Sequence, residues 1–331
     1  MNAVKKPKQK ANAVFEGGGV KGIGIAGALS VASKYYDWLY VAGTSAGAII
    51  AALVAAGYTP AEIRDRLYNF DFRNVEDPDA IGQVPWIGPL LSLEFNLGIY
   101  KGDYMENWIR EALRQKGIRL FGDLVVPRSG KNPRDRYRLR VVASDISTGD
   151  MLVLPQDIAR YGIDPDYLDV ARAVRMSLSI PYFFQPVKVS YIDDTGKRNV
   201  SYIVDGGVLS NFPVWLFDEC RGAEKLPTFG FKLVSPDEGR PNRVKGPITM
   251  LKALFETMME AHDNRYIEEE NFQRTIAIPT LGIRTTDFHI SSEKARELFQ
   301  AGASAAEKFF KTWDYQHYMT KYAVKLTASK R

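Results

Sequence analysis

The sequence predicts an α/β fold built on a parallel central sheet. Residues 11–15 and 38–42 are apolar runs typical of buried strands, and each precedes a stretch with helical spacing, at 23–33 and 46–56. Glycines separate each strand from the helix that follows it. Strands and helices in alternation favour parallel strands that are joined by right-handed crossovers.

The rest of the chain shows no internal repeat and no obvious linker. The expected elements are a helix that Thr59 caps at Pro60, helices over 101–115, 166–179, 251–273 and 291–311, strands over 138–146 and 228–234, and a hairpin of 186–194 with 199–207. We therefore predict a basic disordered arm at 1–10, a single domain over 11–311 and a C-terminal tail at 312–331.

Composition limits the classes of function. The 331 residues carry a net charge of +5, which favours approach to anionic surfaces but is not typical of a dedicated nucleic-acid-binding protein. Cys220 is the one cysteine, so the sequence holds no disulfide framework and no cysteine-based metal site, and a reducing compartment fits. Asp145, Asp150 and Asp157 match no cation-binding loop and are expected to be solvated.

The sequence gives few signs of membrane segments. The N-terminus contains lysines but lacks the apolar region of a signal peptide, and no run of about 18 apolar residues is present. Residues 80–93 carry no charge and include Trp86 and Ile87, so they form either a lid that contacts lipid or a part of the core. We expect a cytoplasmic protein with peripheral contact to a membrane surface.

A serine lies between two glycines where a predicted strand meets a predicted helix. Gly43, Ser45 and Gly47 form the pattern G-x-S-x-G in the segment GTSAG. In hydrolases this pattern exposes the serine hydroxyl on a sharp strand-to-helix turn, and the N-terminus of the helix faces any anion formed there. The alternative is a helix N-cap, which serine commonly provides. The flanking strand and helix favour the nucleophile.

Three consecutive glycines, Gly17, Gly18 and Gly19, follow the first strand in the segment EGGGVKG. Such a loop can direct several backbone N–H groups at one anion, either a phosphate or the oxyanion of a tetrahedral intermediate, and the alternative is a plain tight turn. A P-loop pattern is absent, and the second strand does not end in the acidic residue of a dinucleotide site. A nucleotide site is therefore only weakly indicated.

Asp205 ends a predicted strand, and Gly206 and Gly207 follow it. An Asp-Gly pair is typical of a turn. At the end of a strand, however, an aspartate lies on the same rim as a strand-to-helix turn, provided that the two strands run in the same direction. It can then reach a serine hydroxyl as a general base.

Taken together, these segments resemble the three signatures of the patatin-like phospholipase family, in the same order: GGGVKG, GTSAG and DGG. Softer similarity extends through IYKGDYMENWI, VVASDISTGD and SLSIPYFFQPV, so that the resemblance spans about residues 11–215. The segment after about Cys220 carries no signature.

The resemblance implies a three-layer α/β/α fold with a mostly parallel central sheet. It also implies a Ser–Asp dyad of Ser45 and Asp205, with backbone amides of Gly17, Gly18 and Gly19 as the oxyanion hole. The supporting motif residues are Lys21, Gly22, Gly43, Gly47, Gly206 and Gly207. The implied activity is phospholipase A-type hydrolysis of lipid esters through an acyl-enzyme, without a metal or another cofactor. Phospholipid or another lipid ester is the implied partner, nucleic acid is not, and the oligomeric state stays open.

Two alternatives stay open. His262, His289 and His317 all follow Asp205, so the chain order also fits the Ser–His–Asp triad of an α/β-hydrolase. Against this, the serine turn comes early for that fold, and each histidine lies in a polar or helical segment. The other alternative is a non-catalytic lipid or nucleotide sensor, which the presence of both Ser45 and Asp205 argues against.

Overall fold

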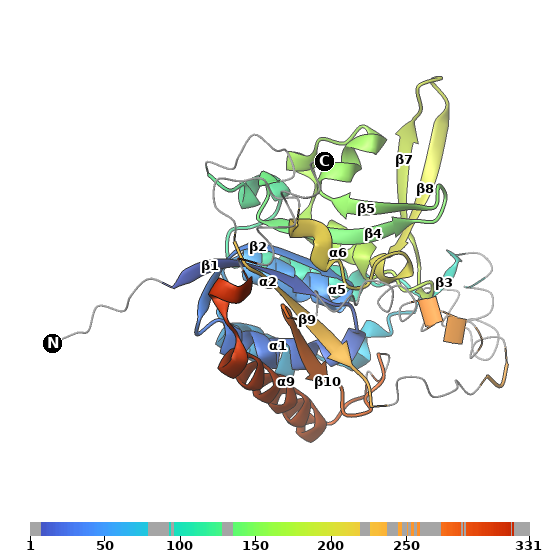
Figure 1. The fold of residues 1–331 in the computed structure, drawn as a ribbon. Helices are drawn as coiled ribbons and strands as arrows, with labels where there is room; N and C mark the ends of the chain where they lie inside the picture. Colours follow the sequence, from blue (N-terminus) through green and yellow to red (C-terminus); the bar gives the residue numbers. More distant parts are fainter. Residues whose placement is uncertain are drawn as a thin grey trace.

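A computed structural model provides the arrangement of the chain (Figure 1). It describes residues 8–78, 96–127, 135–218, 226–236, 273–285 and 289–318, together with positions 93, 244–246, 250, 253–254, 257–258, 287 and 320. The predicted helix over 251–273 and the segment 80–93, expected to be either a lid or a part of the core, lie almost wholly outside the described residues.

An eight-stranded mixed sheet forms the centre of the molecule. Its parallel part has the order β10 (Thr275–Pro279), β9 (Thr228–Val234), β1 (Gln9–Phe15), β2 (Tyr36–Thr44) and β4 (Leu139–Asp145). The remaining strands are β5 (Asp150–Leu154) and β8 (Arg198–Asp205), both antiparallel to β4, and β7 (Val187–Ile192), antiparallel to β8. β3 (Gly98–Tyr100) and β6 (Tyr182–Phe184) form a separate parallel pair.

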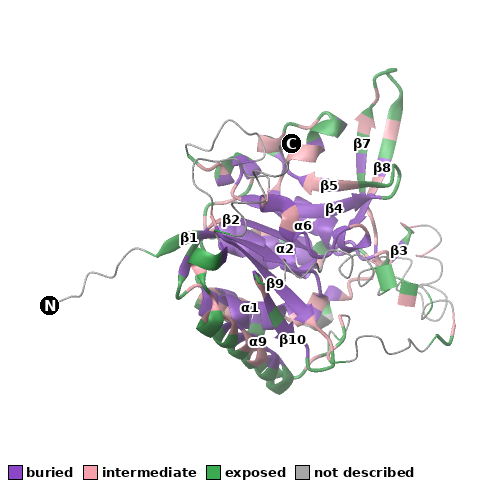
Figure 2. Cartoon of the chain, in the orientation of Figure 1, coloured by how far each residue is buried: buried purple, intermediate pink, exposed green. Residues whose placement is uncertain are grey.

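Helices cover one face of this sheet. They are α1 (Gly22–Ala32), α2 (Ala46–Ala55), α3 (Pro60–Tyr68), α5 (Asp103–Arg114), α6 (Val170–Ser177) and α9 (Ser292–Thr312). Successive residues of a strand point to opposite faces, so Ala13 and Phe15 of β1 join the large core under these helices while Val14 faces away. Val14 packs with Leu216 and Phe217 of the short helix Val214–Phe217, which makes the third layer. The buried centre runs through all three layers (Figure 2).

The predicted fold class is confirmed: the molecule is a three-layer α/β/α structure with a parallel-rich central sheet. The largest difference in a predicted boundary concerns the expected helix over 166–179, which begins only at Val170. A separate turn over Pro165–Tyr167 precedes it, and the side chain of Asp169 accepts from the N–H of Arg172 as the N-cap. Among the described residues, no helix combines the length and the apolar character needed to cross a membrane.

Helices α1 and α9 cross at backbone-contact distance. A Cβ atom at Gly27 of α1 would lie 1.9 Å from the carbonyl oxygen of Phe299, and one at Gly302 of α9 would lie 1.9 Å from that of Gly24. Only glycine fits at these two positions, since real Cβ atoms never approach so closely. The crossing fixes α9 to the helix that begins directly after the glycine loop.

Candidate active site

Ser45 occupies the turn between β2 and α2 in a conformation that few non-glycine residues adopt. Its backbone has φ +52° and ψ −127°, and the residue is almost fully buried. The side chain makes no capping hydrogen bond to α2, so the N-cap hypothesis gains no support. A Cβ atom at Gly43 would lie 2.4 Å from the carbonyl of Gly47, which explains why glycines flank the turn. Strain of this kind at a strand-to-helix turn is typical of a nucleophile elbow.

Ser45 and Asp205 meet on one edge of β4. Thr44 of β2 pairs with Val142, and Asp205 of β8 pairs with the next residue, Ala143. β5 pairs with residues 141–145 of β4, which include residues that pair with β2 and with β8, so these two strands must share the opposite edge of β4. The C-terminal ends of β2 and β8 therefore meet on this edge, at Val142 and Ala143 of β4.

The sequence analysis assumed that the strand before Asp205 runs in the same direction as the strand before Ser45, and this assumption is wrong. β8 is antiparallel to β4, which is parallel to β2. Ser45 and Asp205 still come together because the two strands approach head to head along a shared edge. Asp205 thus lies at the end of an antiparallel strand that approaches Ser45 from the direction opposite to β2.

The carboxyl group of Asp205 is completely buried. Burial raises its pKa to about 7, while the N–H of Gly207 and the Ser45 hydroxyl lower it. Oδ1 accepts from the Gly207 N–H at 2.8 Å, and within the described part of the chain Oδ2 has no partner of good hydrogen-bond geometry. The Ser45 hydroxyl is therefore near enough to lower the pKa of the carboxyl group, although its geometry is not that of a close hydrogen bond.

The glycine loop lies directly beside Ser45. A Cβ atom at Gly17 would lie 3.1 Å from the Cβ atom of Ser45. Two of the loop amides are already engaged, because the N–H of Gly17 donates to the Asn211 carbonyl at 3.2 Å and that of Val20 to the Thr285 carbonyl at 3.3 Å. Among the described residues, the N–H groups of Gly18 and Gly19 have no acceptor. These two amides are the ones available to an oxyanion.

The other motif residues surround these groups. Gly206 lies so close to β4 that a Cβ atom there would be 2.2 Å from the Val142 carbonyl oxygen. Lys21 packs its side chain against the loop, with Cε 3.3 Å from the position of a Cβ atom on Gly18. Gly22 begins α1 and has Ala46 as its nearest neighbour. Lys21 thus has a place in the loop and no contact with Ser45 or Asp205 among the described interactions.

Two residues outside the predicted set hold the glycine loop. Asn211 accepts the Gly17 N–H through its backbone carbonyl, and its Nδ2 donates to the Gly17 carbonyl at 3.4 Å. Thr285, in the segment between β10 and α9, accepts the Val20 N–H. Asn211 follows the DGG signature by a few residues, whereas Thr285 acts through its backbone and carries no side-chain signal.

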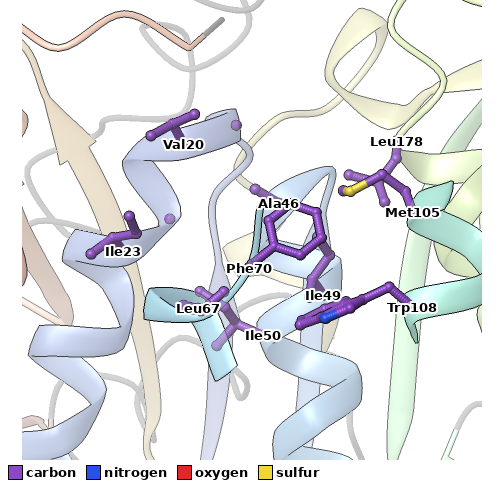
Figure 3. A pocket seen from close by; sticks show the side chains of 12 residues that line it. Val20, Ile23, Ala46, Ile49, Ile50, Leu67, Phe70, Met105, Trp108 and Leu178 are labelled. Atoms are coloured by element: carbon purple, nitrogen blue, oxygen red, sulfur yellow. The ribbon is translucent and has the colours of Figure 1, made fainter. Parts of the chain in front are cut away.

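An apolar cavity of about 50 Å³ opens beside the elbow (Figure 3). Ala46, Ile49 and Ile50 of α2 form one wall, and Val20 of the glycine loop contributes to another. The remaining lining residues come from the glycine loop, α1, α3, α5 and the segments that follow α3 and α6: Gly19, Gly22, Ile23, Leu67, Phe70, Met105, Trp108 and Leu178. This lining contains no charged side chain, so the cavity is suited to hydrocarbon.

The histidines do not complete a triad within the described residues. His289 and His317 are exposed, and the pKa of Asp205 responds to Gly207 and Ser45 but to no histidine. His262 lies outside the described residues. The geometry therefore favours a two-residue arrangement of Ser45 and Asp205.

The expectation that Asp145 is solvated is wrong. Asp145 is completely buried at the end of β4, where its carboxylate accepts from the Tyr161 hydroxyl at 2.7 Å and from the Ser147 N–H at 2.8 Å. Asp150 is exposed and Asp157 accepts from the Val153 N–H. Asp145 therefore stabilises a loop, and no group of three or more metal-binding side chains occurs in the described ranges.

Several known proteins are similar to this chain in sequence. The family model "Patatin-like phospholipase" matches residues 13–218. The Bacillus subtilis (strain 168) protein YqhO is 45% identical over 308 residues, which cover 91% of this chain and 98% of YqhO. "Probable lipid hydrolase 463L" of Invertebrate iridescent virus 6 is 26% identical over 225 residues, which cover 63% of each chain.

A solved structure shares the fold. VipD from Legionella pneumophila superimposes with a TM-score of 0.53 and 16% identity, over 95% of this chain and 72% of VipD. At that identity the likeness concerns the fold alone. The family match, in contrast, spans more than half of the chain and includes the glycine loop, Ser45 and Asp205. The chain belongs to the patatin-like phospholipase family.

Proposed function

We propose that the protein is a lipid acyl hydrolase of the phospholipase A type, which cleaves ester-linked fatty acids with Ser45 as nucleophile and Asp205 as base. One observation carries this proposal: Thr44 and Asp205 pair with consecutive residues of β4, so that the strained Ser45 lies beside a buried carboxyl group. Membership of the family and the similarity to a viral protein named as a lipid hydrolase support the substrate class.

The mechanism follows from the chemistry of these groups. Asp205 takes the proton from the Ser45 hydroxyl while Oγ forms a bond to the ester carbonyl carbon. The electron pair of the carbonyl moves onto its oxygen, which the N–H groups of Gly18 and Gly19 stabilise. When this pair returns, the bond to the alcohol breaks, and the alcohol leaves with the proton from Asp205.

Water then releases the fatty acid. Asp205 takes a proton from a water molecule as the water oxygen attacks the acyl carbon, and Ser45 Oγ leaves with that proton. Each loss of an oxyanion donor typically costs 10²–10³ in rate, so the two free amides contribute as strongly as the base. None of these steps requires a metal or another cofactor.

The apolar cavity is the proposed site of the acyl chain near the ester. It lies between the glycine loop and the first turns of α2, and Ala46, which directly follows Ser45, lines it (Figure 3). Its volume of about 50 Å³ is that of one or two water molecules, so a long chain must displace side chains or continue along the surface. Phe70 and Trp108 are the bulky side chains in its wall, and the centroids of their rings lie 4.8 Å apart.

Fatty-acid release tests the proposed function. We expect wild type to release fatty acid from phospholipid vesicles and to cleave a p-nitrophenyl ester, and Ser45→Ala to lose both activities by at least about 10³-fold. His289→Ala should keep both activities, because His289 takes no part in catalysis by a Ser–Asp dyad.

Other outcomes would point to the alternatives. A folded His289→Ala variant without activity would favour the Ser–His–Asp triad. Wild type that binds vesicles and cleaves neither substrate would favour a non-catalytic lipid-binding protein, and would end the enzyme proposal.

We further propose that the β7–β8 hairpin contacts the lipid surface. β8 pairs with β4 only over 203–205, so the hairpin continues beyond the C-terminal end of β4 (Figure 1). On its outer face Ile192 pairs with Arg198, and Lys188 with Tyr202. Ile192 is 71% exposed. Exposed aliphatic groups beside cations suit an anionic phospholipid surface.

Charge reversal tests this contact. Lys188→Glu with Arg198→Glu should weaken binding to anionic vesicles by about tenfold or more, since each cation near such a surface contributes about 1 kcal/mol. Lys308→Glu with Lys311→Glu changes the net charge equally on α9, at the opposite end of the sheet. Vesicle sedimentation compares the two. Equal losses in both double variants would show that net charge acts alone and would exclude the hairpin.

A further inference from the structure

Ser177, the last residue of α6, touches the backbone of the nucleophile elbow. Its Oγ accepts a hydrogen bond from the Ser45 N–H at 2.8 Å and donates one to the Val142 carbonyl at 2.6 Å. The residue is completely buried. Both bonds have good distances, so the orientation of the hydroxyl is fixed by two backbone groups.

The Ser177 hydroxyl replaces a direct backbone hydrogen bond between the two strands at this position. The ladder between β2 and β4 ends at the pair Thr44 and Val142. At Ser45 the chain leaves the strand with φ +52°, and the Ser177 hydroxyl lies between the Ser45 N–H and the Val142 carbonyl. A buried N–H without an acceptor would be costly, so the bridge stabilises the turn where the strand ends.

The same segment holds the strand that arrives from the other side. The Asp205 N–H donates to the Ser179 carbonyl at 2.9 Å. Residues 177–179 thus bind the backbone of both members of the dyad at the point where β2 and β8 meet.

A buried guanidinium anchors this segment. Arg175 donates to the Ser179 hydroxyl and to the carbonyls of Lys101 and Gln185, the latter at 2.9 Å. Burial lowers its pKa to about 10, so it stays a cation at neutral pH. The end of α6 is thereby tied to the β3 and β6 pair and has little freedom to move relative to the elbow.

On these contacts, and given the proposed hydrolase function, we propose that Ser177 is a positioning residue for the nucleophile. Its hydroxyl holds the Ser45 backbone in the strained conformation that directs Oγ toward Asp205 and the glycine loop. It does not touch the substrate. Because misplacement of a reacting group by about 1 Å can cost 10²-fold in rate, loss of this bridge should reduce the rate of reaction more than the binding of substrate.

The experiment compares Ser177→Ala with Ser177→Cys and with Ser201→Ala. Ser201 is a matched control, since it is equally buried on β8 and no hydrogen bond within the described residues joins it to Ser45, Val142 or Asp205. The measurements are kcat and KM on a p-nitrophenyl ester, the rate at which a fluorophosphonate labels Ser45, and the Tm.

We expect Ser177→Ala to lower kcat and the labelling rate together by about 10- to 100-fold, with KM changed less than about threefold. Ser177→Cys, whose sulfur is a weak donor and acceptor, should fall between wild type and alanine, and keeps the test available if the alanine variant does not fold. Ser201→Ala should keep the wild-type kcat even where its Tm falls.

Unchanged kcat and labelling in Ser177→Ala, or equal losses in Ser201→Ala at equal Tm, would overturn the positioning role and leave the proposed function intact. If wild type neither cleaves the ester nor reacts with the fluorophosphonate, the proposed function fails and the positioning role fails with it.

Discussion

Asp205→Asn is expected to abolish ester hydrolysis and, at pH 8, to make the protein more stable than wild type. Loss of a general base typically costs 10²–10⁴ in rate. Asparagine has the same shape and still accepts the Gly207 N–H at the position of Oδ1. The stability gain arises because wild type must hold a fully buried carboxylate in its charged form at this pH.

The pH dependence has a definite sign. Burial raises the pKa of Asp205 to about 7 in the folded protein, whereas a free aspartate has about 4. Between these values the folded state binds a proton that the unfolded state has released, so the contribution of Asp205 to stability falls as pH rises from about 4 to about 7. At pH 8 the charged, buried carboxylate lowers the free energy of unfolding of wild type by an amount of the order of 4 kcal/mol. Asparagine carries no charge and removes this loss.

Thermal unfolding at pH 5, 6, 7 and 8 measures this effect. The Tm of Asp205→Asn should exceed that of wild type by an amount that grows with pH and levels off above about 7. In wild type, kcat/KM should fall about tenfold per pH unit below 7, since only the carboxylate accepts the serine proton. A Tm difference that does not depend on pH would contradict the raised pKa, and full activity of the variant would exclude Asp205 as the base.

Gly302→Ala is expected to destabilise the protein by at least about 2 kcal/mol. The added Cβ atom would lie 1.9 Å from the carbonyl oxygen of Gly24, and a backbone oxygen cannot turn away as a side chain can. Helix α9 must therefore shift from α1, and the contacts of α9 with β10 shift with it. Gly27→Ala should act in the same way against the Phe299 carbonyl.

Gly22→Ala is the matched control on α1. A Cβ atom there would approach Ala46 no closer than 3.4 Å, and alanine favours a helix by up to about 1 kcal/mol over glycine. Chemical denaturation should thus separate a neutral or stabilised Gly22→Ala from strongly destabilised Gly27→Ala and Gly302→Ala. Similar losses of unfolding free energy in all three variants would contradict this explanation. They would mean that helix propensity and loop constraints, and not the close contact of α1 with α9, determine the stability.

Local patterns in the sequence predicted the elements around the site. The turn at Ser45 follows from a buried strand, two glycines and an apolar helix, all within about 20 residues. The same holds for β9, whose predicted bounds match the structure. The assignment of roles to Ser45, Asp205 and the glycine loop rests on the resemblance to a family and stays a prediction until activity is measured.

Features that depend on contacts between distant segments leave no local pattern in the sequence. The direction of β8 depends on how it pairs with β4, some 60 residues earlier in the chain, and a strand sequence alone carries no direction. Thr285 acts through a carbonyl group that every residue has. Asp145 matches no cation-binding loop and was therefore expected to be solvated, but the Tyr161 hydroxyl that donates to its carboxylate belongs to another segment.

The head-to-head meeting of β2 and β8 on β4 has a consequence for synthesis on the ribosome. A nascent chain that has emerged to residue 145 already contains Ser45 and the edge of β4, yet it lacks the carboxylate that lies opposite. β1, which leads into the glycine loop, also waits for its second neighbour until β9 appears at 228–234, and the loop gains its Thr285 contact later still. The proposed active site is therefore complete only after most of the chain has been translated.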